Sequence, residues 1–343
     1  MITALPQPPE IDPYAAPALR WGILGTGWIA DRFVAALQAH TAQVVAAVGS
    51  RSAEGAARFA AAHGIATAHP TYDALVADPQ VDVVYVATPH NAHLEHALLA
   101  IAAGKHVLVE KPLCLTAAQA RRLADAAAAA GVFAMEALWT LFLPKYAVLG
   151  RLLADGVLGE LCSVQADIGE WFAPTHRIFD PALAGGAMMD MATYPVTFAL
   201  WAAGAPLQVA AVGSRADSGV VSRTAAVLQT PAGVQCLVEA SIDTELPTTA
   251  AVAGSDALLR VDGPFYQPGG FMLAGRDGTE LRYDEPTVAH AALFHQAVHV
   301  ATCIGQGRLD SPIRPLADSI LLLETMDRIR ACTGDVLVGE DLN

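Results

Sequence analysis

Gly25 and Gly27 are the residues whose types and spacing most clearly indicate a chemical role. With Ala30 they form the pattern G-x-G-x-x-A, between an apolar run that predicts a buried strand (residues 21–24) and a four-residue apolar repeat that predicts a helix. Gly25 allows a tight turn, Gly27 lets the backbone approach a pyrophosphate, and Ala30 lets the helix pack closely on its strand. The run therefore predicts a dinucleotide-binding loop, in which helix-start N–H groups face the phosphates; a tight turn without a ligand is the alternative. The expected ligand contacts are Gly25, Thr26, Gly27, Trp28 and Ile29.

The second expected strand, Val44–Gly49, is followed by Ser50 and Arg51. In a dinucleotide-binding sheet an Asp or Glu at this point accepts hydrogen bonds from the ribose 2′-hydroxyl of NAD. A hydroxyl and a guanidinium are instead suited to a 2′-phosphate. We therefore expect NADP as the cofactor in preference to NAD, held by Ser50 and Arg51. The alternative for Arg51 is a solvated charge in a loop.

Apolar strands alternate with helices through the first 140 residues. The expected strands are residues 21–24, 44–49, 81–87, 107–109 and 132–138. Nearly uninterrupted apolar strands belong to sheets covered on both faces, and repeated β-α units predict a parallel, doubly wound α/β sheet. Ligands bind at the carboxyl ends of such strands. Those ends are Gly25, Ser50, Thr88 with Pro89, Lys111 and Trp139.

The pattern changes after Pro144. Runs of alternating apolar residues, separated by turn residues, cover 162–169, 209–214, 225–229, 235–242, 249–253 and 258–261, and they predict a largely antiparallel sheet. We expect helices over 145–154 and 189–203 and two closing helices over 289–305 and 316–332. The expected organisation is an N-terminal tail (1–18), a dinucleotide-binding domain (19–140) and an α+β domain with a large, mostly antiparallel open sheet (141–343). An open sheet face needs covering, so we expect a homodimer or homotetramer formed through it.

Composition excludes several functional classes. Of 343 residues 54% are hydrophobic, but charges such as Asp125 and Glu136 interrupt the longest apolar stretches, so none has the length of a membrane span. A net charge of −14 argues against a nucleic-acid partner. The N-terminus carries Glu10 and Asp12 and lacks the apolar core of a signal peptide. Five cysteines without C-x-x-C spacing suggest reduced thiols in a cytoplasmic protein and no zinc knuckle.

Three further stretches carry a family resemblance. Residues 104–113 read G-K-H-V-L-V-E-K-P-L, residues 135–144 read M-E-A-L-W-T-L-F-L-P, and residues 185–195 read G-G-A-M-M-D-M-A-T-Y-P. With the glycine loop they resemble the Gfo/Idh/MocA oxidoreductases over about residues 20–330 and, within that family, the dimeric dihydrodiol dehydrogenase branch, which oxidises trans-dihydrodiols and some aldopyranoses with NADP. The resemblance implies a Rossmann dinucleotide-binding domain followed by a sheet domain. One difference is Leu141, where that branch usually has arginine.

The resemblance implies that Lys111 and Tyr194 lie at the nicotinamide and that Asp190 orients the lysine or the substrate. Elementary chemistry agrees, because oxidising a secondary alcohol needs a hydride acceptor near the carbon and a base for the hydroxyl proton. A tyrosine with an ordinary pKa of about 10 is a poor base, but a nearby ammonium favours its phenolate. Asp190 and Tyr194 are four residues apart, so a helix brings them to one face. The alternatives are a solvated Lys111, a helix cap at Asp190 and a core aromatic at Tyr194.

Several other residues complete the expected sites. The family pattern suggests that His90 and His93 lie near the nicotinamide, and Glu110 belongs to the Glu-Lys-Pro motif at the cofactor. The expected substrate contacts are Trp139, Phe142, Trp171, Arg177, Asp190 and Tyr194, because flat aromatic faces suit a sugar or diol and Arg177 resembles a family position that holds substrate oxygens. Core packing is the alternative for the aromatic residues, and a surface location is the alternative for Arg177. A metal site at His90, His93 and His96 lacks a completing carboxylate or cysteine, so we expect no metal.

These observations predict an NADP-dependent oxidoreductase. It would transfer a hydride between NADP and a secondary alcohol or carbonyl of a sugar, a cyclic polyol or a trans-dihydrodiol, with Tyr194 as acid/base assisted by Lys111. Two alternatives stay open. One is a non-catalytic NADP-binding redox sensor or regulatory protein, and the other is an enzyme that retains its cofactor through the whole cycle.

Overall fold

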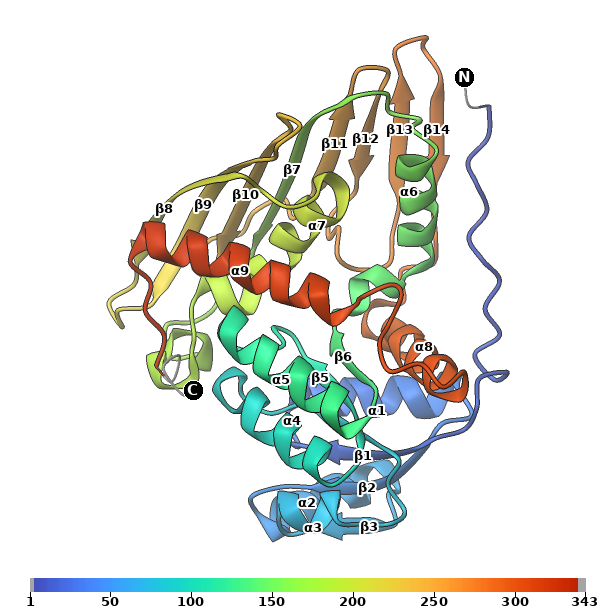
Figure 1. The fold of residues 1–343 in the computed structure, drawn as a ribbon. Helices are drawn as coiled ribbons and strands as arrows, with labels where there is room; N and C mark the ends of the chain where they lie inside the picture. Colours follow the sequence, from blue (N-terminus) through green and yellow to red (C-terminus); the bar gives the residue numbers. More distant parts are fainter. Residues whose placement is uncertain (1–2, 339–343) are drawn as a thin grey trace. The chain divides into compact units, whose positions relative to one another are not determined.

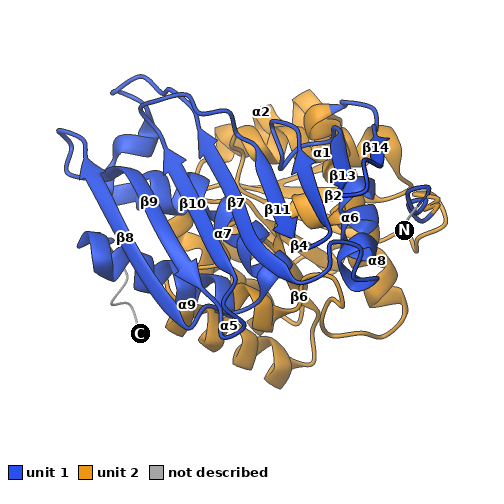
Figure 2. Cartoon of the chain, turned by 90° about the horizontal axis from the view of Figure 1, so that it is seen from above, with its two compact units in different colours: residues 1–9, 143–288, 321–341 blue, residues 10–142, 289–320, 342–343 orange. Residues whose placement is uncertain are grey.

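The computed structural model describes residues 3–338 and divides into two compact units (Figure 2). The six-stranded unit comprises residues 10–142 and 289–320, and the eight-stranded unit comprises residues 3–9, 143–288 and 321–338. The expected tail and last domain also include residues 1–2 and 339–343, which lie outside the described residues. No helix within residues 3–338 is both long and apolar enough to cross a membrane.

The six-stranded unit is built on a parallel sheet, which confirms the expected doubly wound fold. The strands lie in the order β3-β2-β1-β4-β5-β6. Their bounds are β1 (Arg20–Leu24), β2 (Val44–Gly49), β3 (Thr67–His69), β4 (Val83–Val86), β5 (His106–Glu110) and β6 (Ala134–Ala137). Only the three-residue β3 was not expected. Trp21, Phe33 and Tyr85 form the centre of the core, where the Phe33 and Tyr85 rings stack with centroids 3.9 Å apart.

Helices cover both faces of this sheet (Figure 1). The helices are α1 (Trp28–His40), α2 (Ala53–His63), α3 (Tyr72–Val76), α4 (His93–Ala102), α5 (Ala117–Ala130) and α8 (Phe294–Gly305), with single 3₁₀ turns η1 (His90–Ala92), η2 (Trp139–Phe142) and η6 (Ala289–Leu293). α1 contacts α2 and α8, whereas α4 contacts α3 and α5. Right-handed crossovers in this strand order put these two groups on opposite faces.

The C-terminal segment 289–320 groups with the six-stranded unit, whereas the sequence pattern places it in the second domain. The physical reason is the packing of η6 and α8 on α1, which buries the apolar side of α8. Local residue preferences account for both ends of α2: the Ser52 side chain accepts from the Gly55 N–H (3.2 Å) at its start, and Gly64 ends the helix in the left-handed conformation.

The eight-stranded unit contains a mostly antiparallel open sheet, again as expected. The strand order is β14-β13-β12-β11-β7-β10-β9-β8, and only β7 and β10 pair in parallel. The bounds are β7 (Leu161–Gly169), β8 (Gln208–Arg215), β9 (Val221–Gln229), β10 (Gln235–Ser241), β11 (Ala250–Gly254), β12 (Ala257–Val261), β13 (Phe271–Gly275) and β14 (Glu280–Tyr283). β13 and β14 were missed, because each is short and is bounded by turn residues.

One face of this sheet is covered by helix. The helical elements of the unit are α6 (Pro144–Ala154), η3 (Arg177–Phe179), η4 (Pro181–Leu183), η5 (Met188–Ala192), α7 (Thr193–Ala203) and, from residue 321 on, α9 (Leu316–Thr333). α7 packs on β7 and β10, and seven of its residues are buried. Burial alternates along β9, so that every second side chain lies on the face away from α7 and is exposed.

Candidate active site

The glycine turn follows β1 directly. Gly25 has a φ of +109°, and a Cβ there would lie 2.5 Å from the carbonyl oxygen of Ala87, so only glycine fits. The Gly25 N–H donates to the carbonyl of Gly49 (3.0 Å), which holds the turn against the neighbouring strand. Around Gly27, at the N-terminus of α1, a Cβ would meet no atom within 4 Å, and no side chain of residues 3–338 caps this helix end. Open space beside a helix N-terminus fits a pyrophosphate.

A hollow lies beside the carboxyl ends of β2 and β3. Arg51, Thr71, Tyr72, Glu95 and His96 are among the residues that line it. The Tyr72 and His96 rings meet edge-on with centroids 4.6 Å apart. Burial lowers the pKa of His96, so its ring is neutral at neutral pH and Arg51 supplies the positive charge of the hollow. Ser50, which precedes Arg51, is buried, and its hydroxyl accepts from the Ser52 N–H (3.4 Å).

Lys111 follows β5 and begins a segment with a cis Lys111–Pro112 peptide bond. The preceding Glu110 is buried, and its carboxylate accepts from the Tyr85 hydroxyl and from the Lys111 N–H (3.1 Å). Burial raises the pKa of Glu110 to about 7, against the opposing effect of these partners. Glu110 therefore supports the backbone that carries Lys111.

His93, an expected cofactor contact, lies between two backbone turns, and its contact with the cofactor stays a prediction. Its ring is fully buried, with Nε2 lying 2.9 Å from the Thr88 carbonyl oxygen and Nδ1 lying 2.8 Å from the Pro112 carbonyl oxygen. Both ring nitrogens thus face backbone, and the side chain links the turn after β4 to the turn after β5. Burial lowers its pKa to about 4. His90 is also buried, with its ring centroid 5.7 Å from that of His93, while Pro89 is exposed.

Trp28, an expected cofactor contact, and Trp139, an expected substrate contact, both pack against His290, which no sequence motif indicates. The Trp139 ring stacks on His290 with centroids 5.5 Å apart, and the Trp28 ring meets His290 edge-on at 4.8 Å. Trp28 is 59% exposed, whereas Trp139 is buried. Phe142 is also buried, against His299 (4.9 Å between centroids). His290 lies in η6, which has no recognisable motif and reaches these rings only through the packing of η6 and α8 on α1.

In the eight-stranded unit a Gly-Gly turn leads into the helix that carries Asp190. A Cβ on Gly185 would lie 2.3 Å from the Ile178 carbonyl oxygen, and Gly186 has a φ of +124°. The Gly186 N–H donates to that same carbonyl (2.8 Å). Asp190 then lies within a π-helical turn, η5, and so inside the helix instead of at its cap. Such wide turns are frequent at functional sites.

Arg177, Asp190 and Tyr194 lie on neighbouring elements of this unit. The buried Asp190 carboxylate accepts from the Arg177 guanidinium, with Oδ1 and Nη2 3.3 Å apart. Arg177 is itself more than half exposed. Tyr194, one turn further along α7, is nearly buried and stacks on Tyr266 with ring centroids 4.4 Å apart.

Tyr266 and the residues behind it were not foreseen. The Gln267 side chain donates to the Tyr266 hydroxyl (3.1 Å), and the Lys145 ammonium donates to the Gln267 carbonyl. Lys145 is fully buried, and burial lowers its pKa to about 8. No sequence pattern distinguishes a buried lysine at the start of a helix from a solvated one. Trp171, an expected substrate contact, is 60% exposed and its backbone bridges to Asp243.

Comparisons with known proteins identify relatives over nearly the whole chain. Residues 19–138 match the model of an oxidoreductase family with an NAD-binding Rossmann fold, and residues 146–260 match the GFO/IDH/MocA C-terminal domain. The trans-1,2-dihydrobenzene-1,2-diol dehydrogenase of Macaca fascicularis is 35% identical over 325 residues, covering 92% of this chain and 97% of that protein. The Homo sapiens protein of the same name is 34% identical over 328 residues, with the same coverage.

Solved structures agree on the fold. KijD10, a 3-ketoreductase from Actinomadura kijaniata solved with NADP and TDP-benzene, has a TM-score of 0.83 at 29% identity and covers 92% of this chain and 98% of its own. A levoglucosan dehydrogenase solved with NADH and levoglucosan has a TM-score of 0.84 at 20% identity, with 93% and 98% coverage, and it shares the fold.

Proposed function

The chain belongs to the Gfo/Idh/MocA family and is an oxidoreductase with an NAD(P)-binding fold, and we propose that it transfers a hydride between NADP and a secondary alcohol or carbonyl. The proposed substrates are sugars, cyclic polyols and trans-dihydrodiols, in keeping with relatives named as a dihydrodiol dehydrogenase and a 3-ketoreductase. The observation that carries the proposal is Lys111 at the carboxyl end of β5, in the same sheet whose first strand ends at the glycine turn.

Each proposed catalytic residue has a defined task. Bound NADP would supply the hydride acceptor or donor. Tyr194 exchanges a proton with the substrate hydroxyl, and the Lys111 ammonium stabilises the tyrosine as its phenolate. Asp190, paired with Arg177, orients the substrate oxygens or the lysine. The Tyr266 ring keeps water from one face of Tyr194, as their stacking at 4.4 Å supports.

The catalytic roles are tested by kinetics with a substrate screen. NADP reduction is measured across aldoses, inositols and trans-dihydrodiols for the wild type, Tyr194→Phe and Lys111→Met. Loss of an acid/base group should lower kcat by at least about a hundredfold. The matched control is Lys105→Met, since Lys105 precedes β5 at its amino end and binds the carbonyls of Asp78 and Val81.

Near-normal turnover in either site variant would remove the proposed role. NADP binding without turnover on any of these substrates would instead favour the non-catalytic NADP-binding protein. A cofactor that survives dialysis through repeated turnover would indicate transfer between two substrates without release.

The preference for NADP rests on Ser50 and Arg51, which follow β2, and Arg51 lines the hollow there. A guanidinium pairs with the 2′-phosphate that NAD lacks. Arg51→Glu should therefore raise the Kd of NADP at least about tenfold more than that of NAD, because it replaces an attraction by a repulsion. Fluorescence quenching titrations with both cofactors measure this ratio, and equal effects on the two would contradict the assignment.

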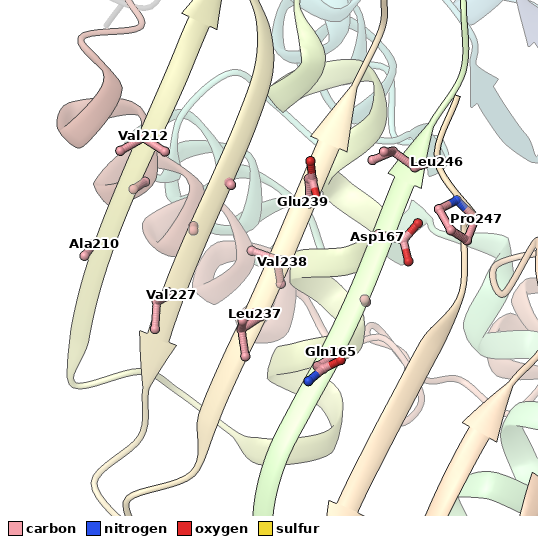
Figure 3. Close-up of a pocket in the computed structure, with 14 residues that line it drawn as sticks. Gln165, Asp167, Ala210, Val212, Val227, Leu237, Val238, Glu239, Leu246 and Pro247 are labelled. Carbon is pink, nitrogen blue, oxygen red and sulfur yellow. The ribbon is translucent and has the colours of Figure 1, made fainter. Parts of the chain in front are cut away.

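We further propose a homodimer or homotetramer through the open sheet face. Figure 3 shows residues of this face that line a hollow on the neighbouring strands β7, β10, β9 and β8. Val212, Val227 and Leu237 on it are 72%, 50% and 44% exposed, which is unusual for apolar residues on neighbouring strands. Another copy of the same face would cover them.

The five cysteines are free thiols, which supports the proposed cytoplasmic location.

A further inference from the structure

Three buried side chains hold the backbone of Lys111–Leu113, called here the Lys111 segment. Glu110 accepts from the N–H of its first residue (3.1 Å), and His93 contacts the carbonyl of its second (2.8 Å). Glu136, on β6, accepts from the N–H of its third through Oε1 (2.8 Å). Every residue of the segment thus has one backbone polar group within hydrogen-bond distance of a buried side chain.

Glu136 is itself bound by a distant part of the chain. Its second oxygen, Oε2, accepts from Nε (3.0 Å) and Nη2 (2.6 Å) of Arg314 and from the Ser319 hydroxyl (2.8 Å). The Glu136 side chain is 0% exposed and that of Arg314 is 4% exposed. Arg314 is placed in turn by its backbone N–H, which donates to the Ser311 hydroxyl (2.9 Å).

The arrangement divides the two carboxylate oxygens between two tasks. Arg314 and Ser319 together place three donors on Oε2 and so anchor that end of the carboxylate. Oε1 is then directed at the Leu113 N–H. An unpaired carboxylate is costly to bury, so without the guanidinium it would be more stable rotated toward water. The orientation of Oε1 therefore depends on Arg314.

From this geometry we propose that Glu136 and Arg314 are positioning residues for Lys111. They act through the backbone of the Lys111 segment and touch neither substrate nor cofactor. The inference rests on the proposed function, in which Lys111 is catalytic. It assigns the C-terminal segment 309–320 a part in catalysis, since a misplacement of about 1 Å in a catalytic group lowers turnover by about a hundredfold.

The test compares two double variants that differ in one group. E136Q/R314M keeps a carbonyl oxygen that can accept from the Leu113 N–H, and E136M/R314M removes it. Both remove the ion pair together, which avoids leaving one charge buried alone. We expect E136Q/R314M to retain kcat within about threefold, because the uncharged amide of glutamine does not need the buried cation that the carboxylate needs. E136M/R314M should lose at least about tenfold, with the Kd of NADP unchanged in both variants. Amide exchange at Leu113 should be faster in E136M/R314M alone.

Equal kcat values for the two double variants would overturn the proposal. If E136M/R314M does not fold, amide exchange in the wild type decides. Protection of the Leu113 N–H like that of the amides of β5 supports its attachment to Glu136, and unprotected exchange refutes it. The stability control is D82N, which breaks the pair with Arg20 (2.6 Å) at the amino ends of the same sheet and should leave kcat unchanged. Lys111→Met separates the two hypotheses, because normal turnover there removes the proposed function itself, whatever the double variants show.

Discussion

At the scale of residues, buried charges support the loops behind the candidate catalytic groups. In the eight-stranded unit this support is Lys145, whose ammonium binds the Gln267 carbonyl next to Tyr266. Burial lowers its pKa to about 8 from an ordinary 10.5, although the charges of Glu285 and Asp262 act in the opposite direction. Below about pH 8 the folded state therefore contains a buried ammonium, and burying this charge lowers the free energy of unfolding.

The stability of the protein should rise with pH because of this one group. A depressed lysine pKa in the folded state means that the favourable contribution is complete above pH 10.5 and is lost as the pH falls through about 8. The full range corresponds to about 3 kcal/mol. Urea unfolding at pH 7.5, 9 and 10.5 should show the free energy of unfolding of the wild type rising relative to that of Lys145→Met. A difference between the two proteins that does not change with pH would contradict this account.

At the scale of elements, glycine is needed for two different reasons in the turn between β1 and α1. Gly25 is required by the fold, because its φ is +109° and a Cβ would meet the Ala87 carbonyl at 2.5 Å. Gly27 has a φ of −83° and open space around it, so the fold does not require glycine there. Its lack of a side chain matters only if a ligand approaches the backbone.

Two alanine variants distinguish these requirements. Gly25→Ala should lower the melting temperature by several degrees or prevent folding, because a positive φ and a backbone clash both oppose the new side chain. Gly27→Ala should leave the melting temperature of the unliganded protein unchanged and raise the Kd of NADP at least about tenfold. Differential scanning fluorimetry with and without NADP measures both effects. Unchanged NADP affinity in Gly27→Ala would argue against a pyrophosphate at this turn.

At the scale of the whole molecule, segments distant in the sequence determine which parts of each sheet unit are covered and which are exposed. In the six-stranded unit, residues 289–320 return to cover α1 and to bind Glu136. In the eight-stranded unit, one sheet face is covered by α7 and the other carries exposed valines and a leucine (Figure 3). The second face is where we propose that copies of the chain associate.

Leu237→Glu should convert the proposed oligomer to a monomer. Leu237 lies on β10, near the middle of the exposed face, and a carboxylate there would be buried against apolar residues on association. Light scattering coupled to size exclusion should show the mass falling to that of one chain. Val44→Glu is the control, because Val44 is also a half-exposed strand valine but belongs to the other sheet. An unchanged mass for Leu237→Glu, or a monomeric wild type, would contradict the proposed interface.

The sequence by itself determined the features that depend on neighbouring residues. The glycine turn, the alternation of β and α, and the antiparallel strands after Pro144 all follow from local periodicity and backbone preference, and the fold confirms them. The residues proposed for the site were found by motif, and their catalytic roles stay predictions.

Only the tertiary structure decided which distant residues support them. Glu136 and Arg314 are 178 residues apart, and His290 and Tyr266 reach Trp139 and Tyr194 from segments without any motif. β13 and β14 are recognisable only by the strands that they pair with. Periodicity in a sequence reports which face of an element is buried but not what it is buried against, because the partner is selected by packing across the whole chain.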